Sequence, residues 1–199
     1  MESKKQELTI KLLLLGDQAV GKSSLMMRYT DDEFNFNIMG TAGVDLKRKT
    51  LVINGENIKV NIYDTAGHER FRLIAKSQYK GSKGIVIIYD ITDKKSFENI
   101  TYWMNHIKEN SDSAVEIMLV GNKIDLSSER AVQFEEGQAL AEKNSVSFTE
   151  TSAKTGENVE AAFFKLVQNI YNHESAAGRQ ETVNTTALNQ KKKTNSKCC

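Results

Sequence analysis

The sequence predicts an α/β fold of three layers, in which a six-stranded, mostly parallel sheet carries helices on both faces. Short runs rich in Ile, Val and Leu alternate along the chain with segments of helical periodicity, which is typical of parallel sheets. A loop bounded by glycines follows the first of these runs, at the position where such folds bind their ligands. The alternation and the loop together predict one α/β domain with its site at the carboxyl ends of the strands.

Six segments are predicted as strands because they are short and rich in apolar, β-branched residues. They cover Leu8–Leu15, Val44–Ile53, Ile58–Tyr63, Gly84–Tyr89, Ile117–Val120 and Ser147–Phe148. Asn54-Gly55 joins the second and third segments and suits a two-residue hairpin turn. We therefore expect one antiparallel pair in an otherwise parallel sheet.

Helices are predicted where apolar residues recur at helical spacing. A short helix, Ser24–Tyr29, should follow the glycine loop. Two further stripes consist of Phe97, Ile100, Met104 and Ile107, and of Val159, Phe163, Leu166 and Ile170. We interpret both stripes as core packing.

Composition divides the chain into a domain, residues 1–173, and a flexible tail, residues 174–199. The tail holds five basic and two acidic residues, a net charge of +3, which leaves −2 on the domain. A mildly acidic domain argues against nucleic-acid binding, and a basic tail suits an anionic membrane. Both cysteines are the last two residues, so no disulfide framework is expected. No apolar run approaches the roughly 18 residues that a membrane span needs.

The glycine loop has the pattern of a phosphate-binding loop. Its residues are Gly16, Asp17, Gln18, Ala19, Val20, Gly21, Lys22 and Ser23. The glycines let successive backbone N–H groups point at phosphate oxygens, and the following helix adds its positive dipole end. Lys22 would reach the outer phosphates, and the Ser23 hydroxyl would ligate Mg²⁺. The pattern alone also fits an ATPase.

Two later motifs also follow strand ends. Asp64-x-x-Gly67 places a carboxylate where it can hold Mg²⁺, with Gly67 free to donate a backbone N–H to the terminal phosphate. By itself, this short pattern could equally be an aspartate capping a turn.

Asn122-Lys123-x-Asp125 selects the base, because the Asp125 carboxylate suits the two parallel donors of guanine and rejects adenine. Ser152-Ala153-Lys154 offers a backbone N–H to the guanine O6 and a lysine stem to cover the ring. The four motifs together predict a guanine-nucleotide switch.

These residues resemble the Ras superfamily of small GTPases over nearly all of residues 8–173, and within it the Rab branch. The motifs that carry the resemblance are Gly43-Val44-Asp45, residues 64–72, Tyr79-Lys80-Gly81, residues 150–154 and Cys198-Cys199. The resemblance implies hydrolysis of GTP to GDP with Mg²⁺. It assigns Thr41 to Mg²⁺ and the terminal phosphate, Phe34 to the edge of the guanine and Ser24 to the first phosphate.

The sequence departs from the Rab pattern at the surface that effectors read. This effector surface comprises Gly43, Val44, Asp45, Leu46, Tyr63 and Gln78. Leu46, Tyr63 and Gln78 occupy positions where Rabs carry an aromatic triad of Phe, Trp and Tyr. We infer a partner set different from that of the common Rabs, with neutral drift as the alternative.

His68 occupies the position where a glutamine commonly orients the attacking water, so it joins Lys22 and Gly67 as a catalytic candidate. We expect intrinsic hydrolysis about tenfold slower than with glutamine. The alternatives are a solvent-exposed histidine without effect, and a binding module held mostly in the GTP state. Gln18, which is bulky enough to crowd the terminal phosphate, favours the module.

The tail ends in Cys198-Cys199 after Lys191-Lys192-Lys193 and Lys197. By resemblance, two terminal cysteines mark double prenylation, and two lipid chains anchor stably where one is marginal. A metal site or a free thiol pair is the alternative reading of the cysteines alone.

The resemblance thus implies a monomeric switch of vesicle transport on the cytoplasmic face of an endomembrane or the plasma membrane, cycling with the cytosol. The implied partners are exchange factors, GTPase-activating proteins, effectors, a GDP-dissociation inhibitor and a prenylation escort. A Ras-type or Rho-type signalling role fits the terminus less well.

Overall fold

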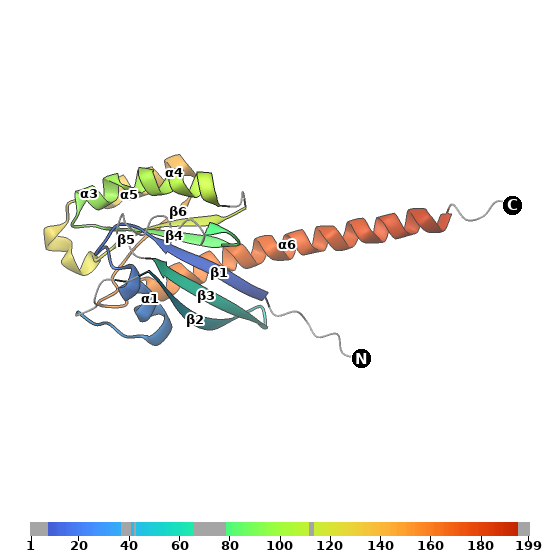
Figure 1. Ribbon diagram of the computed structural model, residues 1–199, viewed down its shortest axis with the longest axis horizontal. Coiled ribbons are helices and arrows are strands. Elements are labelled where there is room, and N and C mark those ends of the chain that lie inside the picture. Colours follow the sequence, from blue (N-terminus) through green and yellow to red (C-terminus); the bar gives the residue numbers. More distant parts are fainter. Residues whose placement is uncertain (1–7, 37–40, 42, 66–78, 112–113, 195–199) are drawn as a thin grey trace.

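A six-stranded sheet forms the centre of the molecule (Figure 1). The computed structural model describes residues 8–36, 41, 43–65, 79–111 and 114–194, with side chains described to residue 176. The strands are β1 (Leu8–Leu15), β2 (Val44–Ile53), β3 (Glu56–Thr65), β4 (Gly84–Asp90), β5 (Glu116–Asn122) and β6 (Ser147–Thr151). They lie in the order β2-β3-β1-β4-β5-β6, and every neighbouring pair except β2–β3 is parallel. The predicted six-stranded, mostly parallel sheet is confirmed.

The one antiparallel pair is the predicted hairpin. Asn54 and Gly55 both have positive φ, 51° and 77°, which a tight turn of this kind requires. Ile53 therefore pairs directly with Glu56, and the register continues to Val44 opposite Thr65. This register sets which residues of β2 and β3 lie beside each other at the end near the site.

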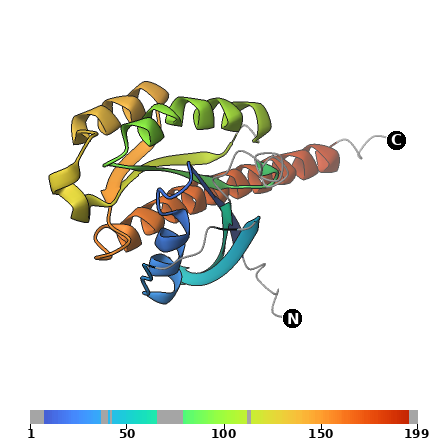
Figure 2. The same ribbon diagram turned by 60° about the vertical axis from the view of Figure 1, so that its left-hand side comes forward.

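Helices cover both faces of the sheet (Figure 2). Side chains of β1 alternate between two buried clusters: Ile10, Leu12 and Leu14 enter one, whereas Leu13 and Leu15 enter the other. The first cluster includes residues of α1 (Lys22–Asp31) and α6 (Val159–Thr194), and the second includes residues of α4 (Ile100–Asn110) and α5 (Phe134–Asn144). A strand buried on both faces is the reason why β1 reads as a continuous apolar run.

The predicted helical stripes pack in the core, with Phe97 only partly buried, and their elements have different bounds. The α1 helix begins at Lys22, directly after Gly21, and so includes two residues more at its start than predicted. Phe97 lies on a separate short helix, α3 (Lys94–Glu98), which precedes α4. The division falls at Asn99, whose side chain bonds to Asp17 of the glycine loop instead of continuing the stripe.

The last helix continues beyond the predicted boundary between domain and tail. Val159, Phe163, Leu166 and Ile170 are buried as the stripe predicts. The backbone then stays helical to Thr194, so α6 projects past the sheet (Figure 1). Residues 174–194 hold no proline, and their alanines and lysines favour a helix more than Gly178 and the four threonines disfavour it. The division at residue 173 itself stays a prediction.

Within the described ranges, no helix combines the length with the apolar character that a membrane crossing needs. A short 3-10 helix, η2 (Ile124–Glu129), completes the described elements.

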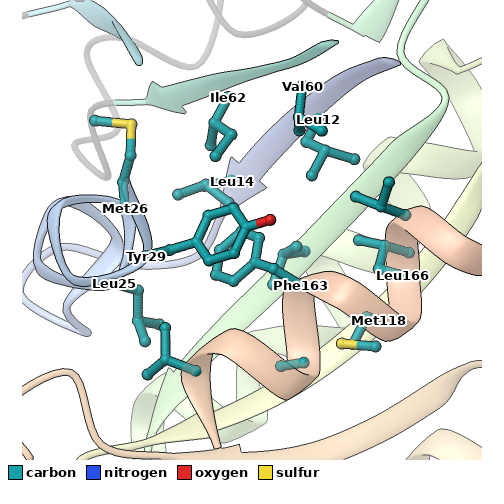
Figure 3. Packing of buried hydrophobic residues seen from close by; sticks show 14 of the residues in the cluster. Leu12, Leu14, Leu25, Met26, Tyr29, Val60, Ile62, Met118, Phe163 and Leu166 are labelled. Atoms are coloured by element: carbon teal, nitrogen blue, oxygen red, sulfur yellow. The ribbon is translucent and has the colours of Figure 1, made fainter. Parts of the chain in front are cut away.

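Tyr29 of α1 stacks on Phe163 of α6 in the first cluster, with ring centroids 4.2 Å apart and planes 11° from parallel (Figure 3). Met26 and Leu25 lie on the same helix and point into this cluster (Figure 3). These contacts fix α1, which starts at the glycine loop, against the sheet and against α6.

Phe163→Ala should lower the free energy of unfolding by about 3–5 kcal/mol, because it removes a buried ring and leaves a cavity beside Tyr29. Phe163 is 3% exposed, whereas the next residue, Phe164, is 38% exposed. Phe164→Ala is therefore the matched control and should cost less than about 1 kcal/mol. Urea unfolding measures both, and equal losses in the two variants would contradict the packing described here.

Candidate functional site

The loop between β1 and α1 has the backbone of an anion-binding loop. Gly16, Ala19 and Gly21 have φ of 141°, 63° and 97°. A Cβ at Gly16 would lie 2.2 Å from the carbonyl oxygen of Ile88, and one at Gly21 would lie 2.3 Å from Nδ2 of Asn122. Both positions therefore require glycine for close approach as well as for φ.

Lys22 lies under this loop and is only 5% exposed. Its Nζ donates to the carbonyl oxygens of Gly16, at 3.0 Å, and of Asp17, at 2.6 Å. Burial lowers the pKa of Lys22 from 10.5 to about 8, although Asp64 and Asp17 oppose the shift. The loop thus presents a cation that is short of anionic partners.

Three oxygen ligands predicted for Mg²⁺ meet beside Lys22. The Ser23 Oγ lies 2.8 Å from Thr41 Oγ1, which donates to Asp64 Oδ2 at 3.0 Å, and Ser23 Oγ also bonds to Asp64. Burial raises the pKa of the Asp64 carboxyl, against the lowering by Ser23, Lys22 and Thr41. The other carboxyl oxygen, Asp64 Oδ1, is buried and has no hydrogen-bond partner among the described residues. Two hydroxyls and a carboxylate with an unused oxygen fit a hard cation such as Mg²⁺.

Asn122 joins the glycine loop to the other side of the site. Its Nδ2 donates to the carbonyl oxygen of Val20 at 2.9 Å. Its Oδ1 accepts from the Ala153 backbone N–H at 3.2 Å and from Thr151 Oγ1 at 3.3 Å. Since Asn122 is 1% exposed, this residue is a structural bridge within the site.

Asp125 is held in place by the Ser152-Ala153-Lys154 segment. The Ser152 hydroxyl donates to Asp125 Oδ1 at 2.6 Å, and Lys154 Nζ lies 3.9 Å from Oδ2. Lys123 has a positive φ of 72° and forms an ion pair with Asp90 at 2.6 Å. The carboxylate of Asp125 consequently has a fixed orientation at the end of the site opposite Lys22.

A cleft of about 390 Å³ runs between these groups. Thirteen of the residues predicted to bind nucleotide line it: Gln18, Ala19, Gly21, Lys22, Ser23, Ser24, Phe34, Thr41, Asn122, Lys123, Asp125, Ala153 and Lys154. The remaining described ones, Gly16, Asp17, Val20, Asp64 and Ser152, support the lining residues from behind. Gly67, His68, Gln78, Cys198 and Cys199 lie outside the described residues.

The structure adds residues that the sequence did not indicate. Phe36 lines the cleft and contacts Phe34 edge-on, with ring centroids 4.9 Å apart. The Asp17 carboxylate points away from the cleft and accepts from Asn99 Nδ2 at 2.5 Å and Trp103 Nε1 at 2.9 Å. No local pattern predicts these contacts, because Asp17 and Trp103 are 86 residues apart.

The predicted effector surface begins next to the site. Leu46 of β2 pairs with Tyr63 of β3, and the adjacent Asp45 pairs with Asp64. Lys11 Nζ lies 5.0 Å from the centroid of the Tyr63 ring, on the side of β3 away from β2. The strand ends that carry this surface therefore also carry Asp64.

Comparison with known proteins agrees with this site. The chain matches the family model described as "Ras family" over residues 11–172. It is 46% identical over 170 residues to the GTP-binding protein ypt2 of Schizosaccharomyces pombe, covering 85% of each chain. It is 44% identical over 191 residues to the Ras-related protein Rab-13 of Rattus norvegicus, covering 95% of this chain and 94% of the relative. It is 42% identical over 203 residues to the Ras-related protein Rab-8B of Homo sapiens, covering 98% of each.

Nucleotide binding should take up a proton at alkaline pH, because a bound phosphate would raise the lowered pKa of Lys22. With a pKa of about 8, Lys22 is mostly protonated at pH 7 and mostly neutral at pH 9. We expect close to zero protons taken up at pH 7 and about one at pH 9. Titration calorimetry of GDP binding in buffers of different ionisation enthalpy measures the number of protons taken up per GDP bound.

Lys22→Arg is the control, since a guanidinium stays charged throughout this range. Any variant that still binds GDP should lose the uptake at pH 9. Equal proton uptake at pH 7 and pH 9 in the unmodified protein would contradict the lowered pKa of Lys22.

Proposed function

This chain belongs to the Rab branch of the Ras family of small GTPases, and from this premise we propose that it is a membrane-anchored switch whose intrinsic GTP hydrolysis is slow. Rab GTPases hydrolyse GTP to GDP, use Mg²⁺ and act in vesicle trafficking. One observation carries the assignment of the site: Lys22, Ser23, Thr41 and Asp125 line one continuous cleft, and Asp64 bonds to two of these residues, Ser23 and Thr41. The groups suited to phosphate, to the metal ion and to the base therefore lie along or beside a single cleft.

The phosphate end of the cleft is built for a polyanion. The loop provides backbone N–H groups at the start of α1, and Lys22 supplies a buried positive charge. Ser23, Thr41 and Asp64 would hold Mg²⁺, which when bound adds positive charge beside the phosphate oxygens. In the described protein these side chains bond to one another, so the polar groups are already gathered before the ligand arrives.

The base end selects guanine through Asp125. Its carboxylate accepts hydrogen bonds from the N1–H and the 2-amino group of guanine, whereas adenine presents an acceptor at N1. The Ser152 hydroxyl, 2.6 Å from Oδ1, keeps the carboxylate in one orientation. This fixed orientation makes the contact specific for guanine, because a misaligned carboxylate could not accept from both the N1–H and the 2-amino group.

The hydrolysis rate depends on a residue outside the described ranges, His68. An imidazole has a reach different from that of a glutamine amide, so it positions the attacking water less well unless a partner helps. Gln18 lines the cleft and adds bulk near the phosphate loop, which supports slow turnover. If hydrolysis is too slow to matter, the second candidate function is an effector-binding module that is held mostly in the GTP-bound state.

Thr41 connects the nucleotide to the effector surface. It lies three residues before β2 begins at Val44, and its hydroxyl bonds to both Ser23 and Asp64. Loss of the terminal phosphate would release Thr41 and change the start of β2. We infer that effectors contact Leu46 and Tyr63 in the GTP state, and that Gln78 completes their surface. Exchange factors, activating proteins, a dissociation inhibitor and a prenylation escort would act on the same cycle.

Rab GTPases act on endomembranes and cycle with the cytosol, and the tail of this chain supplies a means of attachment. The α6 helix carries the backbone about 35 Å past Tyr171, to Thr194, and the last five residues include Lys197, Cys198 and Cys199. Lipid chains on both cysteines would anchor the protein while the nucleotide site remains well away from the bilayer. The attachment would be to the cytoplasmic face of the membrane.

His68→Gln should accelerate single-turnover GTP hydrolysis about tenfold, because the amide orients the attacking water. The measurement uses purified protein preloaded with GTP, with Mg²⁺ added to start the reaction. GDP affinity is measured in both variants and should agree within about twofold. An unchanged rate would remove His68 from the mechanism and leave Gln18→Ser as the variant to compare next.

Replacing Cys198 and Cys199 together by Ser should move the protein from the membrane fraction to the cytosol of its native cells. Each single replacement should leave partial membrane binding, since one lipid chain is marginal. Mass spectrometry of the unmodified protein should show two lipid additions. Free thiols on the membrane-bound protein would contradict lipid anchoring. If the double variant were as abundant in the membrane fraction as the unsubstituted protein, the attachment would lie elsewhere in the chain.

A further inference from the structure

Arg28 of α1 connects this helix to the segment that borders the base end of the cleft. Its Nε donates to the carbonyl oxygen of Ala153 at 2.9 Å, and its Nη2 donates to that of Lys154 at 2.9 Å. The third nitrogen, Nη1, donates to the Asp32 carbonyl oxygen at 2.9 Å and to Asp32 Oδ1 at 2.8 Å. One guanidinium therefore holds two consecutive peptide groups of a distant loop.

Ala153 and Lys154 are cleft residues, so what fixes their backbone also fixes the wall against which a base would lie. The stem of Arg28 runs past Gly156, where an added Cβ would lie 3.5 Å from Arg28 Cδ. Gly156 has a φ of 84°, and the loop turns sharply there to reach α6. The loop therefore passes close to the Arg28 stem at Gly156 and bonds to its guanidinium through Ala153 and Lys154.

The opposite end of the connection is rigid. Leu25, Met26 and Tyr29 bury the inner face of α1 in the first cluster (Figure 3). The same helix carries Lys22 and Ser23 in its first turn. Arg28 consequently links the phosphate end and the base end of the cleft through one helix that cannot shift easily against the sheet.

We propose that Arg28 is a positioning residue for base recognition, which holds the Ala153–Lys154 backbone at the distance from the phosphate loop that a nucleoside diphosphate requires. The inference rests on the nucleotide site proposed above and adds a residue that does not itself line the cleft. Asn122 holds the same segment from the inner side, through the Ala153 N–H. Arg28 holds it from the outer side, through the two carbonyl oxygens.

The geometry requires arginine in particular. A planar guanidinium presents parallel N–H groups to two neighbouring acceptors, whereas a lysine ammonium can serve them only as a single point. The bond to Asp32 contributes less, because Asp32 has a side chain 91% exposed against 17% for Arg28, and exposed ion pairs are weak. The two loop carbonyls are therefore the contacts that matter.

The experiment compares the affinities of GDP and of pyrophosphate, each with Mg²⁺, by displacement of a fluorescent GDP analogue. Pyrophosphate reports the phosphate end alone, whereas GDP reports both ends. Arg28→Lys should weaken GDP binding at least about tenfold and change pyrophosphate binding less than about twofold. Asp32→Asn keeps the helix end but removes the exposed pair, and should leave both affinities unchanged.

Arg28→Gln serves as a second variant, and urea unfolding confirms that each variant is folded. Equal losses for GDP and pyrophosphate, or an unchanged GDP affinity, would overturn the positioning role. Loss of the folded state in both Arg28 variants would overturn it as well, since Arg28 would then support the fold. Asp125→Ala separates the two proposals: if it does not weaken GDP binding either, the proposed site fails, whereas a loss in Asp125→Ala alone refutes only Arg28.

Discussion

The site depends on the hydrogen bonds of the Asn122 side-chain amide, because they join the phosphate-binding half of the site to the base-binding half. It donates to Val20 in the phosphate loop and accepts from Ala153 and Thr151 on the base side. Gly21 must lack a side chain for the amide to come this close. A buried amide that donates one hydrogen bond and accepts two is held in one orientation, and losing one partner costs about 1–3 kcal/mol for the group left unpaired. The spacing of the cleft is therefore set by the protein before a nucleotide binds.

The same site contains polar groups that the fold alone does not satisfy. Lys22 has its pKa lowered to about 8 by burial, and Asp64 has a buried oxygen without a partner in the part of the chain that the structure describes. Each group disfavours the folded protein on its own, and each gains from the ligand expected beside it: phosphate for Lys22 and a cation for Asp64. The buried apolar cluster of α1, α6 and the sheet offsets this unfavourable free energy and holds both groups in place.

The sequence predicted the strands and the motifs that follow their ends, but it did not predict contacts between side chains that are far apart along the chain. All six strands and the hairpin followed from apolar runs and Asn54-Gly55, and the motifs met because carboxyl ends of parallel strands share one edge. Neither the contact of Arg28 with Ala153, 125 residues away, nor the use of Asn99 to hold Asp17 has a local signal. The length of α6 was also missed, because polar residues without proline are compatible with both a helix and an irregular tail.

Alternation along β3 explains how a rigid site can still send a signal. Successive residues of a strand point to opposite faces, so Asp64 points to the face where it bonds to Ser23, whereas the half-buried Tyr63 and its strand partner Leu46 lie on the other face. Thr41 bonds to Asp64 and lies three residues before β2 begins at Val44, and on β3 Asp64 directly follows Tyr63. In the proposed switch, a change of ligand at Asp64 and Thr41 would reach Leu46 and Tyr63 through these neighbouring positions, without any rearrangement of the core. Because Asp64 is fully buried whereas Leu46 and Tyr63 are only half-buried, the positions of Leu46 and Tyr63 can vary in chemistry while the nucleotide site stays the same.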